Sequence, residues 1–160
     1  MARTNGGITG KRNVASFGKC KQTVKTSSGN VCTQPGTRLV KTLIVAGGGG
    51  GGRGTSGGGG AGGLRNIEIS VCGNTAVPVT IGAGGGGGNV SPETVAAKGS
   101  DSNIIGNNGT FESEGGGFGG NYPANVSSGG SGGGAAYGSP GGTIAGGAGN
   151  TPPVSPPQGN

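Results

Sequence analysis

Apolar residues in the first half of the chain gather in three short segments with the spacing of β-strands. The most hydrophobic segment, residues 39–46 (LVKTLIVA), predicts a central strand that is buried on both faces. Residues 64–71 (LRNIEISV) alternate apolar and polar positions, which predicts a strand with one face in the core. Residues 76–81 (AVPVTI) predict a strand that forms a hairpin with 64–71 through a turn at 72–75. Pro78 restricts this last strand to a sheet edge or to a position whose N–H is not needed.

Weaker strand signals precede and follow this group. Residues 21–26 (KQTVKT) and 31–33 are β-prone runs that are separated by turn residues at 27–30. The later apolar residues, at 103–105 and 110–111, are brief anchors between glycine-rich stretches. No segment combines the apolar periodicity of an α-helix with capping residues. The pattern therefore predicts a mainly β protein with little or no α-helix.

Glycine replaces apolar residues between and after these segments. Forty-six of the 160 residues are glycine, and long runs cover 47–52, 57–60 and 84–88. Glycine adds no side-chain area, so such runs cannot build an ordinary hydrophobic core. They can form left-handed helices with three residues per turn, of the polyproline II type, whose backbones hydrogen-bond to one another when packed side by side. A flexible linker is the alternative, and it is disfavoured because strands and aromatic residues interrupt the runs.

The expected fold is a small β-sheet or sandwich that is continued by packed polyglycine II helices in an irregular glycine-rich region. We divide the chain into a basic N-terminal attachment arm (1–25), a glycine-rich β and polyglycine II domain (26–150) and a proline-rich C-terminal tail (151–160). The tail holds four prolines and is expected to leave the body as a polyproline extension. Since only 28% of residues are apolar, we also expect partner subunits to help stabilise the fold.

Positive charge is concentrated near the N-terminus. The first 41 residues hold eight of the eleven Lys and Arg residues, and no acidic residue precedes Glu68. A basic arm of this kind binds an acidic protein surface or nucleic acid, unless its lysines only solvate strand faces. Nucleic acid is disfavoured because the arm has one aromatic residue and no RNA- or DNA-binding motif. The residues expected to attach the arm to a partner are Arg3, Ile8, Lys11, Arg12 and Phe17.

The chain offers little for catalysis. It has no histidine, and Cys20, Cys32 and Cys72 lack the spacing of a zinc site. The cysteines are expected to be small buried thiols, with a Cys20–Cys32 disulfide as the alternative. Glu112 and Glu114 share a strand face and could form a carboxylate pair, although a solvated acidic face is favoured. We expect a protein that is not an enzyme.

Cofactor and membrane binding are not expected either. The glycine run that follows residue 46 satisfies a nucleotide-binding pattern only trivially, because no helix follows whose N-terminus could hold a phosphate. No stretch approaches the ~20 apolar residues of a membrane span, so we expect no membrane insertion. The expectation is therefore a chain without cofactor or metal.

The order of these elements resembles that of one known family. The chain is similar to the glycine-rich domain of tailed-bacteriophage virion proteins, which is common in tail fibres and adhesin tips. The similarity covers about residues 25–150. The residues that carry it are LVKTLIVA (39–46) with the glycines 47–52, the glycines 57–63 with Leu64 and Arg65, VPVTIGAGG (77–85), GSDSNIIG (99–106) and EGGGFGG (114–120).

The resemblance implies packed polyglycine helices that display variable loops to a receptor on the host surface. It implies a homo-oligomer, which we expect to be a trimer, assembled in the host cytoplasm and located in the virion, with the arm attached to another virion protein. The alternatives are a capsid decoration or cement protein and a glycine-rich nucleic-acid-binding protein. The expected loop contacts to a host glycan or outer-membrane protein are Arg53, Thr55, Pro92, Glu93, Lys98, Tyr122 and Tyr137.

Overall fold

A computed structural model describes residues 22–120, 126–138 and 142–160 of the chain. This part is built from short β-strands and glycine-rich connections, and it contains no helix. It therefore holds no helix that is long and apolar enough to cross a membrane. The mainly β class expected from the sequence is confirmed.

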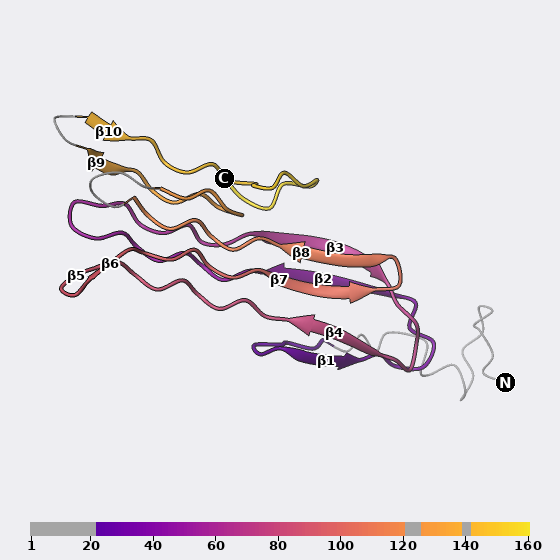
Figure 1. Ribbon diagram of the computed structural model, residues 1–160. Coiled ribbons are helices and arrows are strands. Elements are labelled where there is room, and N and C mark those ends of the chain that lie inside the picture. The colour runs from indigo at the N-terminus through magenta and orange to yellow at the C-terminus, as the bar shows by residue number, and fades with distance from the viewer. Residues whose placement is uncertain (1–21, 121–125, 139–141) are drawn as a thin grey trace.

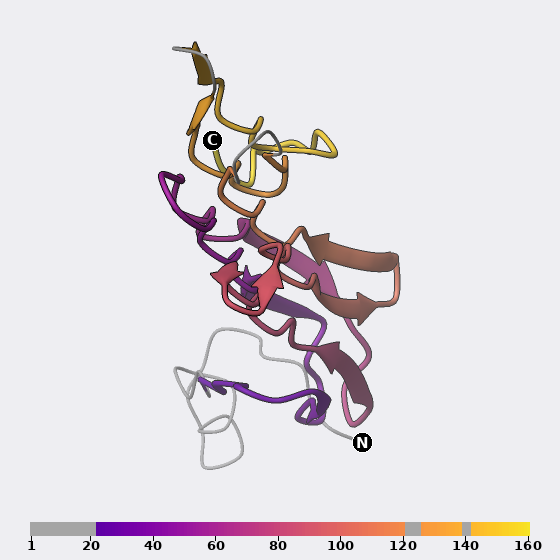
Figure 2. The ribbon, with the colours of Figure 1, turned by 60° about the vertical axis from the view of Figure 1, so that its left-hand side comes forward.

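Six strands form a two-layer sandwich in one half of the molecule (Figures 1 and 2). One layer is an antiparallel sheet with the strand order β1-β4-β7-β8. The facing layer is the antiparallel pair of β2 and β3. The strand bounds are β1 Gly29–Cys32, β2 Leu39–Val45, β3 Leu64–Ser70, β4 Ala76–Thr80, β7 Ser102–Gly106 and β8 Gly109–Ser113.

The hydrophobic core lies between these two layers and is small. Alternate residues of each strand point into it, as the pattern of residues 64–71 predicted: Ile69 is fully buried, whereas its neighbour Glu68 is exposed. Partly buried side chains of both sheets pack around its edge. The buried members are Ile44, Ile69, Val71, Val77 and Ile104.

The hairpin expected between residues 64–71 and 76–81 is wrong. β3 pairs with β2, and β4 pairs with β1 and β7. The turn at 72–75 instead carries the chain from one sheet to the other. Thr33, just after β1, anchors it: the Thr33 hydroxyl donates to the Cys72 carbonyl (2.7 Å) and accepts from the Thr75 N–H (3.0 Å). β4 is an inner strand, and it accommodates Pro78 because its pairing with β7 starts only at Val79.

The expectation that residues 39–46 form a central strand buried on both faces is also wrong. β2 has one partner strand, and its burial alternates along its length. Ile44 is buried in the core, whereas Leu39, Leu43 and Val45 are exposed on the outer face. The apolar residues on that face are not explained by the packing of a single copy of the described chain.

Four weaker segments also differ from their predicted structure. Residues 22–26 of the run at 21–26 form no strand, and β1 begins at Gly29, inside the turn expected at 27–30. Pairing with β4 sets this boundary, because β4 pairs with β1 from Gly29 to Cys32. The brief anchors at 103–105 and 110–111 are the two strands of the hairpin β7–β8.

Beyond the sandwich, the chain continues as glycine-rich segments that run side by side (Figures 1 and 2). We call this region the glycine slab; its segments are 47–60, 82–100, 115–120 and 127–134. Residues 47–52, which follow β2, form backbone hydrogen bonds with four other stretches of the slab. The N–H groups of Gly47 and Gly50 donate to residues 97–100, and those of Gly49 and Gly52 donate to residues 57–60, at 2.8–3.0 Å. Carbonyls of the same segment accept from residues 85–88 and 116–119 at 2.8–2.9 Å.

The hydrogen bonds to each neighbour recur every three residues. This is the repeat of a polyproline II-type helix, which has no internal hydrogen bonds and must find its partners on adjacent chains. Close packing makes glycine necessary at the contacts: a Cβ on Gly47 would lie 2.0 Å from the Ala83 carbonyl oxygen, and one on Gly49 would lie 2.2 Å from that of Gly117. The glycine slab is therefore ordered by backbone contacts.

Two small hairpins close the slab at the end far from the sandwich (Figure 1). β5 (Asn89–Val90) pairs with β6 (Glu93–Thr94), and β9 (Ala136–Gly138) pairs with β10 (Gly142–Ile144). The turn at 53–56 lies at the same end of the molecule. This end therefore gathers the loops that connect the glycine segments.

The C-terminal residues do not leave the body as a polyproline extension, which corrects that expectation. Gln158 is buried, with 3% of its surface exposed. Its backbone carbonyl accepts from the Leu64 N–H at the start of β3 (2.7 Å), and its side-chain Oε1 accepts from the Glu114 N–H (2.8 Å). The Asn160 carbonyl accepts from the Gly132 N–H (2.9 Å). The tail therefore packs against the protein where the sandwich meets the slab.

We expect Gln158→Ala to lower the free energy of unfolding by about 1–3 kcal/mol, because it leaves the Glu114 N–H without its acceptor in a part-buried position. Thermal unfolding of the purified protein measures this loss. Gln34→Ala is the matched control, since Gln34 lies in an exposed turn and it is the backbone carbonyl of Gln34 that accepts hydrogen bonds, from the Thr37 and Asn74 N–H groups. Equal melting temperatures for the two variants would show that the side-chain hydrogen bond of Gln158 does not contribute to stability.

Candidate ligand-binding surface

Three loops from distant parts of the sequence are joined at the far end of the glycine slab (Figure 1). Arg53, in the turn 53–56, donates a hydrogen bond from Nη2 to Oε1 of Glu93 and forms an ion pair with it. Glu93 belongs to the hairpin β5–β6. On the other side, the Tyr137 N–H of β9 donates to the carbonyl of Thr55 (3.1 Å). The turn 53–56 therefore ties both hairpins together.

The ion pair between Arg53 and Glu93 holds the β5–β6 hairpin in place. The Arg53 side chain is 16% exposed, whereas that of Glu93 is 69% exposed. The hydrogen bond from Arg53, and then its positive charge, lower the pKa of the Glu93 carboxyl below its ordinary value. The carboxyl thus stays ionised at neutral pH, and the link weakens only when the pH falls below the usual titration range of a glutamate.

The surface around this link presents side chains that suit binding. Thr55 and Pro92 are exposed, and Tyr137, beside the turn, is 56% exposed. Two exposed valines, Val90 in β5 and Val95 just after β6, were missed by the sequence reasoning. The available signal was two β-branched apolar residues in an otherwise polar spacer. An aromatic ring, hydroxyl groups and small apolar side chains on one rigid end can contact a glycan or a protein surface.

Other residues predicted as contacts lie elsewhere. Lys98 is part-buried and forms an ion pair with Glu114 inside the slab, so it does not join the loop residues at the far end. Tyr122 lies outside the described residues. The attachment residues of the arm, namely Arg3, Ile8, Lys11, Arg12 and Phe17, also lie outside them.

The acidic residues Glu112 and Glu114 meet a third carboxylate, that of Asp101. Their carboxylate oxygens lie within 4.8 Å of one another, a spacing that could hold a metal ion. Protein groups already engage two of the three: Lys98 pairs with Glu114, and the Gly115 N–H donates to Asp101 Oδ1 (2.7 Å). Glu112 is exposed on the outer side of β8. The contacts of Glu114 and Asp101 within the protein therefore explain the cluster without a metal ion.

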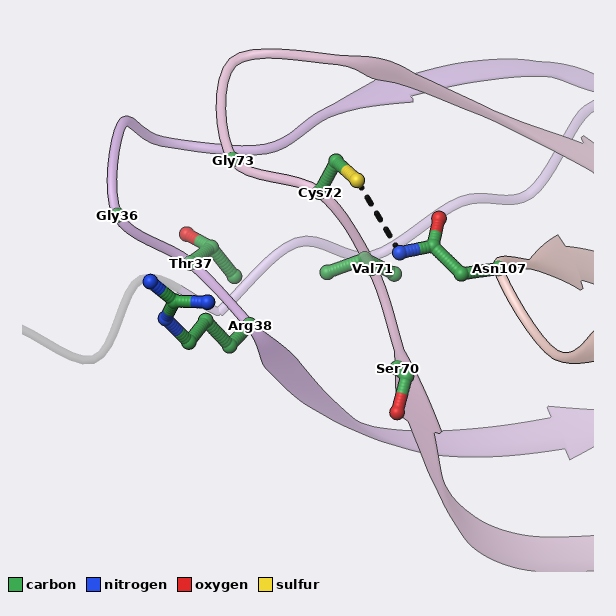
Figure 3. A pocket seen from close by; sticks show the side chains of 8 residues that line it. All are labelled: Gly36, Thr37, Arg38, Ser70, Val71, Cys72, Gly73 and Asn107. Carbon is green, nitrogen blue, oxygen red and sulfur yellow. Dashed lines mark hydrogen bonds between the residues drawn. The ribbon is translucent and has the colours of Figure 1, made fainter.

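A hollow of about 460 Å³ lies at the opposite end, beside the turns of the sandwich (Figure 3). Residues 36–38 and 70–73 line it together with Asn107. The Asn107 Nδ2 donates to Cys72 Sγ at 3.1 Å across it. Cys32 and Cys72 are both exposed free thiols, so the expectation of buried thiols is wrong for these two, and Cys20 lies outside the described residues.

The architecture defines a class of protein: a β-sandwich continued by a glycine slab that carries loops at its far end. Residues 23–160 match the family model of the glycine-rich domain, and the chain belongs to this family. The match includes the C-terminal residues that pack against the slab. Comparison with curated proteins and with solved structures gave no match.

Proposed function

We propose that this protein is a non-enzymatic structural component of a tailed-phage virion that presents the loops at the end of its glycine slab to the host surface. The sequence resemblance to phage virion proteins supports this proposal. The observation that carries it is the joining of three loops on a backbone-packed support, through Arg53 with Glu93 and Tyr137 with Thr55.

This construction suits a receptor-binding end. The strands and glycine segments hold the fold together without the loops, so loop residues can vary while the support stays constant. A support that is already ordered also reduces the entropy lost when the loops bind a partner. The ligand that we propose is a glycan or an outer-membrane protein of the host.

The basic N-terminal arm is proposed to attach the protein to another virion protein. The first described strand, β1, belongs to the sandwich, whereas the joined loops lie at the far end of the slab (Figure 1). With the chain entering on the sandwich side, the loops face away from the particle. The net charge of the remaining chain is close to neutral, which separates the attachment segment from the displayed part.

Particles that lack this protein test the proposal. We expect them to adsorb to host cells more slowly than complete particles and to recover when the purified protein is added back during assembly. Normal adsorption would contradict the receptor-binding role. Antibody labelling of particles and the copy number per virion separate a tail location from the capsid decoration alternative, with tens of copies at a tail and hundreds on a head.

Substitutions in the joined loops are expected to reduce binding of the purified protein to host cells. Tyr137→Ala removes an exposed aromatic side chain and should weaken binding by about tenfold or more if the ring is a central contact. Arg53→Ala frees the β5–β6 hairpin and should have a similar effect. Thr80→Ala, exposed on β4 in the sandwich, is the control. Binding isotherms on whole cells measure the affinities, and equal affinities for all three variants would contradict the assignment.

A further inference from the structure

The outer face of the pair β2–β3 carries an exposed apolar patch. Leu39, Leu43, Val45 and Leu64 are 63, 62, 50 and 51% exposed, respectively. Val45 lies directly opposite Leu64 in the strand register, so these two side chains adjoin. Such side chains normally face a core, and here the core lies on the other face, with Ile44 and Ile69. The patch therefore needs a partner from outside the sandwich.

One charged pair crosses the same face. Lys41 and Glu68 are opposite each other in the register, and Lys41 Nζ lies 3.3 Å from Glu68 Oε1. Both side chains are exposed, at 83 and 54%. The face thus consists of four cross-strand rows: Leu39 with Ser70, Lys41 with Glu68, Leu43 with Asn66, and Val45 with Leu64.

The face is complementary to the same face of a second copy in one arrangement. Consider two copies stacked face to face about a two-fold axis that runs parallel to the strands. Each row then meets the same row of the other copy with β2 and β3 exchanged, which sets Lys41 against Glu68 of the second copy and Val45 against its Leu64. A two-fold axis across the strands, centred on the four rows, would instead set Lys41 against Leu43 of the second copy, so that each ion pair would be covered by uncharged side chains and gain no charged partner from the other copy.

We propose that two copies of this chain pair through the β2–β3 outer face about a two-fold axis parallel to the strands. This goes beyond the proposed function, because it concerns self-association and not the host, and it puts a dimer in place of the trimer expected from the resemblance. The four apolar side chains together expose roughly 400 Å² per copy, which is within the range of the largest apolar patch on a typical monomer, and such a patch is often functional. This apolar area is about half of the roughly 800 Å² per partner that a standard interface buries. We therefore expect weak association, with a dissociation constant in the micromolar range.

Charge reversal tests the pairing and its symmetry together. Lys41→Glu makes the row entirely acidic and Glu68→Lys makes it entirely basic, so each variant alone should be monomeric. An equimolar mixture of the two should associate, because acidic rows then face basic rows. The internal ion pair cannot explain this result, since it is lost in both variants. Thr80→Glu on β4, outside the face, should associate like the unchanged protein.

Sedimentation equilibrium and light scattering on the full chain provide the measurement, with thermal unfolding as the check that each variant folds. Leu43→Ser should weaken association at least tenfold, whereas Ile105→Ser, at a similarly exposed site on β7, should not change it. A monomer at ~100 μM or a trimer for the unchanged protein overturns the proposal. So does a mixture of the two charge variants that stays monomeric.

Discussion

Gly50→Ala is expected to lower the free energy of unfolding by about 3 kcal/mol or more, whereas the same change at the next residue, Gly51, is expected to be harmless. A Cβ on Gly50 would lie 1.9 Å from the carbonyl oxygen of Gly86, and the neighbour is backbone that cannot rotate away. Gly51 has no atom within 4 Å of such a Cβ. Neither residue has a positive φ that would itself exclude alanine.

Thermal unfolding of the two variants measures this difference. We expect a melting temperature roughly 10 °C lower for Gly50→Ala and one equal to or slightly above that of the unchanged protein for Gly51→Ala. Gly86→Ala is a second control, because a Cβ on Gly86 also meets open space although its carbonyl is the group that Gly50 approaches. If all three variants melted together, the glycine segments would not be packed as described.

Ile69→Ala is expected to cost about 3–4 kcal/mol of unfolding free energy. Among the residues that the structure describes, Ile69 is the largest fully buried side chain, and it belongs to a core cluster with five buried members. A small core has few neighbours that can move in to fill a cavity, so the loss should lie toward the upper part of the range for such substitutions.

Denaturant titration gives this value from the midpoint and slope of the transition. Ile105→Ala is the matched control, since Ile105 lies 45% exposed on the outer face of β7 and should cost less than half as much. Similar losses at both positions would mean that the β2–β3 layer and the four-stranded sheet do not enclose the core described here.

The strand segments could be predicted from the sequence, but their partners could not. Alternation identifies residues 64–71 as a half-buried strand because the side-chain period of a strand is two. The turn at 72–75 has the length of a hairpin turn and equally that of a crossing between sheets. The choice is made by Thr33, about 40 residues earlier, which binds both ends of that turn. Such long-range contacts leave no local signal.

The same limit applies to β2. A run of apolar residues indicates burial on both faces of a strand. In a single copy only the inner face of β2 is buried, because no third layer of the described chain covers Leu43 and Val45 on the outer face. The C-terminal tail shows the converse. Its prolines predicted an extension, yet one polar residue, Gln158, docks the tail through bonds to Leu64 and Glu114.

The loops of the candidate site were foreseen from turn-forming residues, but their joining was not. Arg53 and Glu93 are 40 residues apart, and only the parallel course of the glycine segments brings them to the same end. Lys98 was grouped with them from its place in the same spacer. It lies instead beside Glu114, since the chain has already turned back into the slab by that residue.

Amide hydrogen exchange, followed by NMR, tests most directly whether the glycine runs are an ordered slab. The amides of Gly47, Gly49, Gly50 and Gly52 donate to neighbouring segments, so they should exchange at least roughly 100-fold more slowly than in an unstructured chain. The amides of Ile69 and Val71 in the sandwich give the reference for a folded region. Exchange of the glycine amides at unstructured rates, with the sandwich protected, would contradict the slab and would make the runs flexible linkers.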